Sequence, residues 1–327
     1  MFLLLFCIIA QAGCSAAAEP VSKQSFYFDT VCQITVYDME EMSTERAESV
    51  IDDAFSLCKS YERLFSRTIE GTDIDRINRA NGEWTEVSEE TVSLLRTGLQ
   101  YSALSGGRFA ITIGGVSKLW DFHEEEGTLP DDRDLTEALL HVGDDKVEIE
   151  GNRVRLSDSS SEIDLGAIAK GYVADRINDL LLTKGITSAM IDLGGNLSCI
   201  GENVLRKAPF SVGIELPFSD RREIVETTDL ADETIVTSGI YERCFTIGDT
   251  LYHHVLDPKT GYPVLTDLQG VSIKGEKGHS ADCDALSTIC LLLGKEEGTK
   301  LIEGLPGFEA LFIDADGEIS MTEGFQE

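Results

Sequence analysis

The sequence predicts an α+β fold in which helices pack on a mixed, largely antiparallel sheet. Its 327 residues, 42% of them hydrophobic, are enough for one large domain or two intertwined lobes. Short segments with strand periodicity alternate irregularly with helical segments, an order typical of this class. Residues 147–156 add a predicted β-hairpin, because apolar and polar side chains alternate on both sides of a turn at Gly151 and Asn152.

The N-terminal part should open with a strand and three helices. Residues 26–37 alternate apolar and polar side chains, as in a half-buried strand. Residues 43–65 should form a helix, since serine, threonine and glutamate at its start can cap it and apolar residues follow at helical spacing. A short helix is predicted at 72–78, and a longer one from residue 88 to a stop at Gly106.

The middle of the chain mixes both kinds of element. The apolar stretch 109–120 precedes an acidic, turn-rich segment, 121–134, which we expect to be a solvated loop leading into a helix. A strand should end at 162–164, a helix should span 166–184, and a strand at 188–193 should run into a glycine pair. The remainder is expected to alternate strands at 210–216, 234–238, 271–273 and 311–314 with helices at 282–293 and 295–302.

The charge balance excludes two classes of partner. The formal net charge is −32, from 27 Lys and Arg against 59 Asp and Glu. Such an acidic surface repels nucleic acid phosphates and anionic membranes, so we expect no nucleic acid partner and no membrane contact beyond a lipid anchor. An anionic ligand would have to be held by local groups.

The N-terminus predicts export and lipid anchoring. Residues 1–13 have the apolar core and small residues of a signal peptide, and the run ending at Cys14 is similar to a bacterial lipobox, whose cysteine thiol receives a lipid. Residues 14–24 would then be a lipid-anchored tether and 25–327 the catalytic domain, held at the cell membrane and facing outside the cytoplasm. A secreted protein cut near Ala18 and an uncut anchor are the alternatives.

Six further cysteines follow Cys14. They show neither metal-ligand spacing nor the clustering of a disulfide scaffold. We therefore predict that they are small core residues and that no structural zinc site is present.

The segment DLGAIAKGY, from Asp164 to Tyr172, passes from a strand into a helix through a glycine. Free backbone N–H groups and Lys170 therefore collect at a helix start, where they can hold an anion or leave a carbonyl for a metal. By itself the pattern is also typical of a packed helix start with a surface lysine.

Asp284 and Thr288 are four residues apart and so lie on one helix face. Their oxygens are hard ligands that suit Mg²⁺, with room for waters and substrate phosphates. The alternative is a first helical turn with an acid placed favourably for the helix dipole and a threonine facing solvent. Asp282 would be either a second carboxylate or the N-cap.

His254 precedes a turn in which Pro258 fixes φ and Gly261 permits the chain reversal. A stiff turn beside one of only 5 histidines favours a positioned general base, with a structural histidine as the alternative. His253 would point to the other side of a strand and is not the expected base.

Two glycine-loosened segments, 106–109 and 237–243, carry aromatic and guanidinium groups. They can stack on a flat heterocycle and contact phosphate, or their arginines can pair with surface carboxylates. The glycine pair before Asn196 allows a ligand to approach the backbone closely, or simply makes a tight turn.

Five ordered motifs together closely resemble the ApbE family, the FAD:protein FMN transferases. They are DLGAIAKGY at 164–172, DLGGN at 192–196, TSGIY at 237–241, HVLDPKTG at 254–261 and ADCDALST at 281–288. The likeness covers about residues 25 to 325, and it implies the ApbE-like, T-fold-like version of the predicted α+β architecture.

The resemblance implies a Mg²⁺-dependent enzyme that binds FAD, cuts its pyrophosphate and passes the FMN moiety to a threonine or serine hydroxyl of a target protein, releasing AMP. The family's acceptors are exported, flavin-bearing subunits of ion-pumping redox complexes and extracellular reductases, which would carry a Ser/Thr flavinylation motif. Two alternatives use the same residues: a Mg²⁺-dependent FAD pyrophosphatase that gives free FMN and AMP, and a non-catalytic flavin-binding lipoprotein.

The resemblance also implies individual roles. The metal ligands would be the Ala167 carbonyl, the Asp284 carboxylate and the Thr288 hydroxyl, and the catalytic residues would be His254, as the base, and Asp284. The residues that would line the FAD site are Thr68, Arg108, Phe109, Ala110, Asp164, Lys170 and Val255. Ala110 stands where the family usually has aspartate, so one side-chain contact to FAD is absent, and weaker binding or altered specificity is expected.

Overall fold

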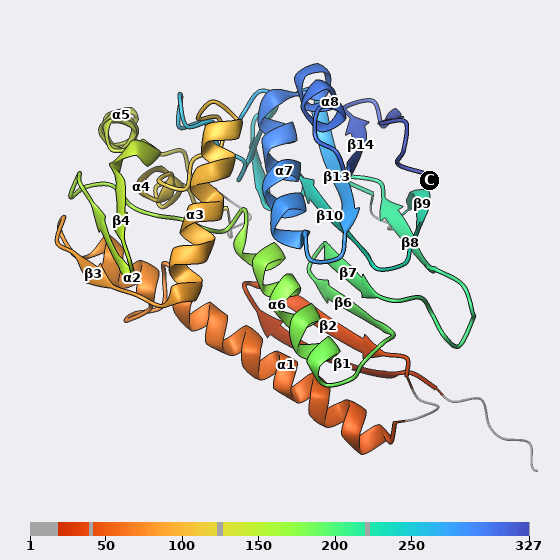
Figure 1. Cartoon of the computed structure of the whole chain (residues 1–327). Helices are drawn as coiled ribbons and strands as arrows, with labels where there is room; N and C mark the ends of the chain where they lie inside the picture. Colours follow the sequence, from red (N-terminus) through yellow and green to blue (C-terminus); the bar gives the residue numbers. More distant parts are fainter. Residues whose placement is uncertain (1–18, 39–41, 123–126, 220–222, 327) are drawn as a thin grey trace, which may run out of the picture.

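An eight-stranded antiparallel sheet forms the centre of the computed structural model, which describes residues 19–38, 42–122, 127–219 and 223–326 (Figure 1). In spatial order its strands are β1 (Val21–Tyr27), β2 (Thr30–Val36), β6 (Ala189–Leu193), β7 (Asn196–Ile200), β10 (Glu233–Gly239), β13 (Leu268–Glu276), β14 (Phe308–Asp314) and β15 (Ile319–Met321). Each neighbouring pair is antiparallel, as predicted. The predicted signal peptide and Cys14 lie outside the described residues.

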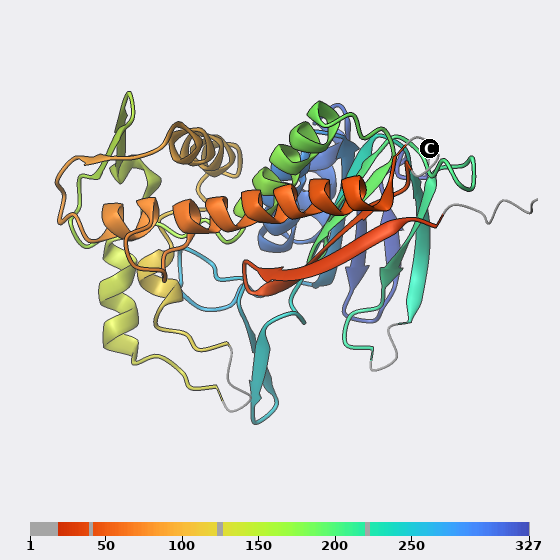
Figure 2. The ribbon, with the colours of Figure 1, turned by 90° about the horizontal axis from the view of Figure 1, so that it is seen from below.

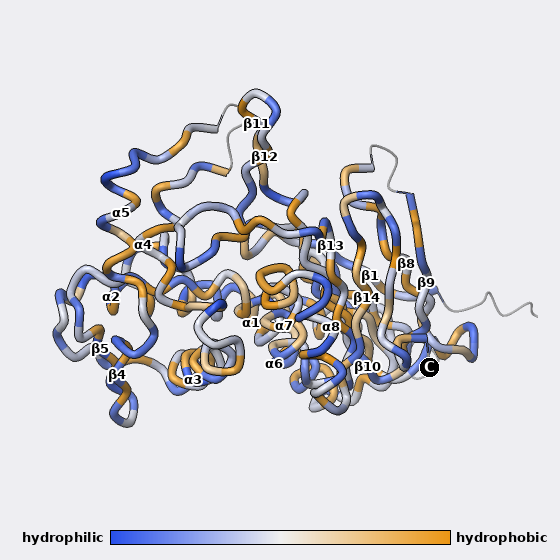
Figure 3. The backbone as a smooth tube through the Cα atoms, turned by 90° about the horizontal axis from the view of Figure 1, so that it is seen from above, coloured by the Kyte–Doolittle hydropathy of each residue, from blue (hydrophilic) through white to orange (hydrophobic). Residues whose placement is uncertain are grey.

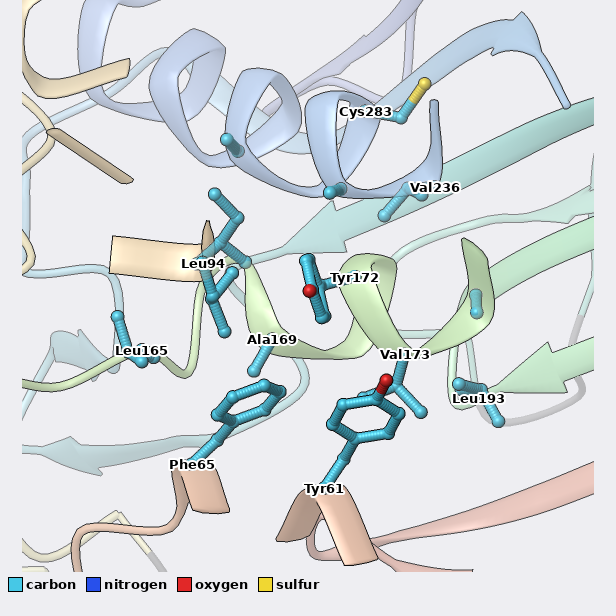
Figure 4. Close-up of a cluster of buried hydrophobic side chains, with 14 of the residues drawn as sticks. Tyr61, Phe65, Leu94, Leu165, Ala169, Tyr172, Val173, Leu193, Val236 and Cys283 are labelled. Atoms are coloured by element: carbon cyan, nitrogen blue, oxygen red, sulfur yellow. The ribbon is translucent and has the colours of Figure 1, made fainter. Parts of the chain in front are cut away.

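Helices cover one face of this sheet. They are α1 (Thr44–Phe65), α6 (Ala169–Thr183), α7 (Ser280–Leu293) and α8 (Lys295–Glu303). Contacts join α6 to both α1 and α7, and Figure 4 shows Tyr61 and Phe65 of α1 beside Tyr172 of α6. The Phe65 and Tyr172 rings meet edge to face, with centroids 5.6 Å apart. The main hydrophobic core lies between these helices and the sheet.

A hairpin of β8 (Phe210–Glu215) and β9 (Ile224–Leu230) covers part of the other face. Successive residues of β14 serve the two faces, as strand geometry requires. Phe312 belongs to the main core, whereas Leu311 and Ile313 pack with Phe210 in a second cluster. The sheet is therefore buried on both sides in this region.

Further elements lie at the left in Figure 1, next to the helical layer. They are α2 (Asp73–Asn78), α3 (Glu89–Leu104), α4 (Gly114–Ser117), α5 (Asp132–Leu140), the short 3-10 helix η1 (Asp144–Lys146) and a small sheet of β3 (Thr85–Glu86), β5 (Arg153–Leu156) and β4 (Val147–Glu150). Leu94 and Leu95 of α3 are part of the main core, so this region is continuous with the rest.

A two-stranded hairpin, β11 (Cys244–Ile247) and β12 (Thr250–His253), projects from the body in both Figure 2 and Figure 3. Phe245 and Tyr252 at its base pack with Trp120 in a third apolar cluster. The two ends of the hairpin lead directly into Arg243 and His254, so the hairpin brings these two residues side by side.

Side-chain caps fix several predicted helix starts. Ser43 accepts the Arg46 N–H at α1, and Thr72 and Ser88 make the equivalent bonds for α2 and α3. The confirmed helices are those predicted at 43–65, 72–78, 88–106, 166–184, 282–293 and 295–302. The confirmed strands are those of the hairpin at 147–156 and those near 188–193, 210–216, 234–238, 271–273 and 311–314.

The single strand predicted at 26–37 is wrong. β1 and β2 form a hairpin there, turning at Phe28 and Asp29, which adopt φ angles of 55° and 57°. Glu62 of α1 holds the turn by accepting the Phe28 N–H (2.8 Å), a tertiary contact that a local pattern does not reveal. The predicted domain boundary at residue 25 therefore lies inside β1.

The strand expected to end at 162–164 is also wrong. Only an isolated bridge joins Glu162 to Ile113. In addition, the sequence analysis missed the strands β3, β7, β9, β11, β12 and β15 and the short helices α4 and η1. The missed strands are mostly short partners of stronger strands, and pairing rather than periodicity defines them.

Among the described residues, no helix has the length and apolar character that crossing a membrane requires. The six cysteines within the described ranges are free thiols; five are buried and Cys244 is partly exposed. Their predicted role as small core residues is confirmed for those five.

Gly171 of α6 sits against α7 so closely that an added Cβ would lie 2.2 Å from the Ser280 carbonyl oxygen. Gly171→Ala should force the two helices apart and lower the free energy of unfolding by about 1–3 kcal/mol, as measured by urea denaturation. Gly115→Ala in α4 is the control, because its nearest neighbour would be 4.0 Å away. An unchanged unfolding midpoint for Gly171→Ala would contradict this packing.

Candidate active site

The site lies where the start of α6 meets α7. The Gly171 N–H donates to Asp284 Oδ2 (3.0 Å), so the Asp284 carboxylate lies at the N-terminus of α6, where the helix dipole favours negative charge. Asp284 is 1% exposed. Its other oxygen, Oδ1, lies 3.7 Å from Lys170 Nζ. The carboxylate is thus fixed through one oxygen and faces a cation with the other.

The three predicted metal ligands come from the same two helices. Thr288 lies one turn after Asp284 on α7 and is partly buried, and Ala167 occupies the turn that leads into α6. Within the part of the chain that the structure describes, no group of three or more His, Cys, Asp or Glu side chains is arranged for a metal ion. A mixed set of carboxylate, hydroxyl and carbonyl oxygens fits Mg²⁺, which keeps several waters and substrate phosphates in its shell.

His254 is held by the backbone of Arg243. The His254 N–H donates to the Arg243 carbonyl (3.1 Å), and Nδ1 of the ring lies 3.3 Å from the same oxygen. A carbonyl only accepts, so this contact places the ring proton on Nδ1 and leaves the lone pair on Nε2. Burial lowers the pKa of His254 to about 4, with smaller contributions from the charge of Arg243 and from His253. The neutral imidazole can therefore accept a proton.

The chain reverses after His254 in the turn that the sequence predicted. The N–H groups of Thr260 and Gly261 both donate to the Asp257 carbonyl, at 3.1 and 2.8 Å, and Gly261 has a φ of 72°. Val255 is buried, and its carbonyl accepts the Val264 N–H (2.9 Å). His253, the last residue of β12, is buried.

Glu242 ties the His254 region to the start of α6. The residue is exposed to solvent, although enough protein atoms lie around its carboxyl group to affect its pKa. Burial raises the pKa of its carboxyl, the negative charge of Asp284 adds to the rise, and Lys170 opposes it. Lys170 also contributes to the lowered pKa of His254. These groups therefore share one electrostatic environment.

Asp164 organises the other side of the site. Its carboxylate pairs with Arg67 Nε (2.9 Å) and accepts the Ser117 hydroxyl and the Gly166 N–H, each at 2.9 Å. Thr68 is exposed beside Arg67. A ligand reaching Asp164 would therefore meet a carboxylate already oriented by three donors and a guanidinium ready for an anion.

Arg108 joins three parts of the site. Its Nη2 donates to the Leu292 carbonyl at the end of α7 (2.8 Å) and lies 3.6 Å from an oxygen of Asp257 in the His254 turn. The Phe109 ring, 4% exposed, belongs to the main core, so it cannot stack on a heterocycle and only its backbone can meet a ligand. Ala110 is partly exposed next to it.

The sequence analysis missed two carboxylates that hold segments next to the candidate site. Asp144 holds the loop after Ala110 by accepting the N–H groups of Ile111 and Thr112, at 3.1 and 3.0 Å. Asp175 of α6 is buried against α7. A carboxylate on an otherwise apolar helix face was the signal available for Asp175, whereas nothing in the sequence linked Asp144 to residues so far along the chain.

The glycine pair before Asn196 makes a tight turn between β6 and β7. A Cβ on Gly194, which has a φ of 65°, would lie 2.1 Å from Thr30 Oγ1. The Gly195 carbonyl accepts the Thr237 N–H (2.9 Å). Two of the glycine-containing segments singled out by the sequence, 194–196 and 237–243, thus meet in the central sheet.

The chain is similar to proteins of known activity over nearly its full length. The model of the ApbE family matches residues 28–312. A Treponema pallidum FAD:protein FMN transferase is 30% identical over 335 aligned positions, which cover 98% of this chain and 91% of that protein. A Klebsiella pneumoniae FAD:protein FMN transferase is 30% identical, and the alignment covers 84% of this chain and 85% of that protein.

Solved structures share the architecture. The crystal structure of the ApbE protein of Thermotoga maritima has a TM-score of 0.85 and 29% identity, and covers 94% of this chain and 100% of that one. The flavin transferase ApbE of Vibrio cholerae, 24% identical, covers 93% of this chain and 97% of its own with a TM-score of 0.81. The predicted α+β class is confirmed.

The neutral state of His254 can be tested by NMR. Because its pKa is lowered to about 4 from 6.5, its ring C–H signals should stay constant until the pH falls well below 6 and should shift near pH 4. The folded state binds this proton less readily than the unfolded chain, so the group's contribution to stability is complete above pH 6.5 and decreases as the pH falls toward 4. His254→Gln assigns the signal. A midpoint near 6.5 would contradict the burial described above.

Proposed function

Since the chain belongs to the ApbE family, we propose that it transfers the FMN part of FAD to a threonine or serine hydroxyl of a target protein and releases AMP. The observation that carries this proposal is the position of Asp284, fixed at the N-terminus of α6 beside Lys170, in one electrostatic environment with the neutral His254. The first group suits a metal-bound diphosphate, and the second suits a hydroxyl nucleophile.

A protein with a net charge of −32 needs local cations to bind an anionic ligand such as FAD. Lys170, Arg67, Arg108 and the N–H groups at the start of α6 can bind the phosphates of FAD. The Ala167 carbonyl, Asp284 and Thr288 would hold a Mg²⁺ ion. When bound, this ion would neutralise charge on the diphosphate and on the leaving AMP.

The remaining predicted residues would position FAD. Thr68 and Asp164 lie together on one side of the site, through Arg67, and the 108–110 loop lies on the other side of Asp164. Val255 is buried next to His254 in the sequence and would line the FAD site there.

The transfer step needs one base. The acceptor hydroxyl oxygen attacks the phosphorus of the FMN half, and the bond from that phosphorus to the bridging oxygen breaks. AMP leaves with the bridging oxygen and its electron pair. The hydroxyl proton passes to Nε2 of His254, which is unprotonated because Nδ1 faces the Arg243 carbonyl.

A transfer assay tests the proposal. With FAD, MgCl₂ and an exported flavoprotein domain that carries a Ser/Thr flavinylation motif, flavin fluorescence should remain on the acceptor after denaturing electrophoresis, with one AMP released per flavin attached. Free FMN and AMP without labelled acceptor would replace the proposal by a pyrophosphatase. Absence of AMP would replace it by a flavin-binding protein without catalysis.

Asp284→Ala should reduce AMP release by more than about 100-fold, since even the outer-shell partners of metal ligands commonly contribute 10–100-fold to affinity or activity. Asp282→Ala on the same helix is the matched control, because Asp282 bonds Tyr101 (2.8 Å) and His279 (2.6 Å) instead. Normal AMP release by a folded Asp284→Ala protein would show that the metal assignment is wrong.

We further propose that the enzyme is lipid-anchored at Cys14 and faces outside the cytoplasm, where exported acceptors would meet it. The apolar run followed by small residues before Cys14 supports this location. Cys14→Ser should move the protein from the membrane fraction to the soluble fraction of the producing cell. Retention in the membrane fraction would contradict the anchor.

A further inference from the structure

The starts of α6 and α7 face each other, and neither is capped by its own N-cap side chain. The N-cap of α6 is Ile168, which is apolar, and the N-cap of α7 is His279, whose Nδ1 is bonded to Asp282 (2.6 Å). The N–H groups of a first helical turn need acceptors from elsewhere. In each of these helices the acceptor comes from the other helix.

The exchange is reciprocal. Asp284 of α7 accepts the Gly171 N–H of α6 (3.0 Å), and Asp175 of α6 accepts the N–H groups of Ser280 (2.9 Å) and Ala281 (3.1 Å) of α7. Asp175 is 4% exposed. Each carboxylate therefore lies at the positive end of its partner's dipole, where a charged acceptor forms its strongest bonds to backbone donors.

The spacing of these hydrogen-bonded residues fixes the two helices against each other. Gly171 and Asp175 are one turn apart on α6, and Ser280 and Asp284 are one turn apart on α7, so the helices run antiparallel through two points of attachment. Between these points the backbones touch, because an added Cβ on Gly171 would lie 2.2 Å from the Ser280 carbonyl oxygen. Loss of one point would let α7 pivot about the other.

We infer that Asp175 is a positioning residue for the cation site: by capping α7 from α6, it sets the position of Asp284 and Thr288 relative to the turn that holds Ala167. This inference rests on the proposed function, because it assumes that these three residues bind a divalent cation. Asp175 itself would touch neither cation nor FAD, since its two oxygens are taken by backbone donors.

The consequence is a specific defect. A pivot of α7 about Gly171 would change the position of Thr288, which lies one turn beyond Asp284, relative to the Ala167 carbonyl. The cation site would lose geometry that Mg²⁺ demands strictly, whereas the Arg67 and Asp164 side of the site would be unaffected. Weaker cation binding, rather than general loss of ligand binding, is the expected result.

Metal binding can be measured without turnover. Mn²⁺ binding is followed by electron paramagnetic resonance with ADP present, which supplies a diphosphate but no flavin to transfer. Burial raises the pKa of Asp175 to about 6 against the effect of its hydrogen bonds, so measurements at about pH 8 keep it ionised. Asp175→Ala should raise the Mn²⁺ dissociation constant about 10–100-fold, and Asp175→Asn, which retains one oxygen acceptor, should raise it less.

Asn178→Ala separates positioning from plain stability. Asn178 is also a buried polar residue of α6, at 1% exposure, but its amide donates to Ser198 of β7 (2.8 Å) rather than to α7. It should lower the melting temperature yet leave Mn²⁺ binding unchanged. In an assay of AMP release, Asp175→Ala should raise the half-saturating Mg²⁺ concentration by the same factor while changing the KM for FAD at saturating Mg²⁺ less than about threefold.

The outcomes separate the two proposals. If the wild-type protein binds no Mn²⁺ with ADP, the metal assignment of the proposed function fails, and this inference fails with it. If the wild-type protein binds Mn²⁺ and folded Asp175→Ala binds it equally well, only the inference is overturned. If Asp175→Ala does not fold, Asp175→Asn and Asp175→Ser are tested in its place. Wild-type affinity for Mn²⁺ in both of these variants overturns the inference.

Discussion

The close contact of α6 with α7 is the constraint on which the rest of the site depends. Two antiparallel helices bring their backbones together at Gly171, and each receives a carboxylate from the other. Buried carboxylates are unfavourable unless they are hydrogen-bonded or paired, and here the bonding groups are helix N-termini that also lack partners of their own. One arrangement therefore satisfies both sets of groups and leaves Asp284 Oδ1 facing Lys170.

The net charge of the chain is at odds with the charge of its expected ligand. A protein with a net charge of −32 has no general attraction for a dinucleotide. Three cations of the described chain lie against carboxylates of the candidate site: Lys170 faces Asp284, Arg67 pairs with Asp164, and Arg108 lies near Asp257. Acidic groups border these cations, and the negative charge of Asp284 contributes to the raised pKa of Glu242.

The sequence was most informative where one local pattern carries the structure. The helix starts at Ser43, Thr72 and Ser88 could be predicted because an N-cap bonds only to residues of its own first helical turn. The turn at Phe28 was not visible because Glu62, far along the chain, stabilises it. The same division holds in the site: Asp284, Lys170 and His254 follow from ordered motifs, whereas Asp144 and Asp175 act on segments that only the folded chain brings near them.

The loop at Ala110 shows how a departure from the family pattern can leave the fold intact. An aspartate at this position, as the family usually has, could serve either the loop or the ligand. Here Asp144 already accepts the N–H groups of Ile111 and Thr112 and the Thr112 hydroxyl, so the loop keeps its shape without a carboxylate at 110. The Asp164 N–H donates to the Ile111 carbonyl (2.8 Å). This bond links the loop to the first residue of the DLGAIAKGY segment, which leads into α6. The support of this loop therefore does not depend on the side chain at position 110.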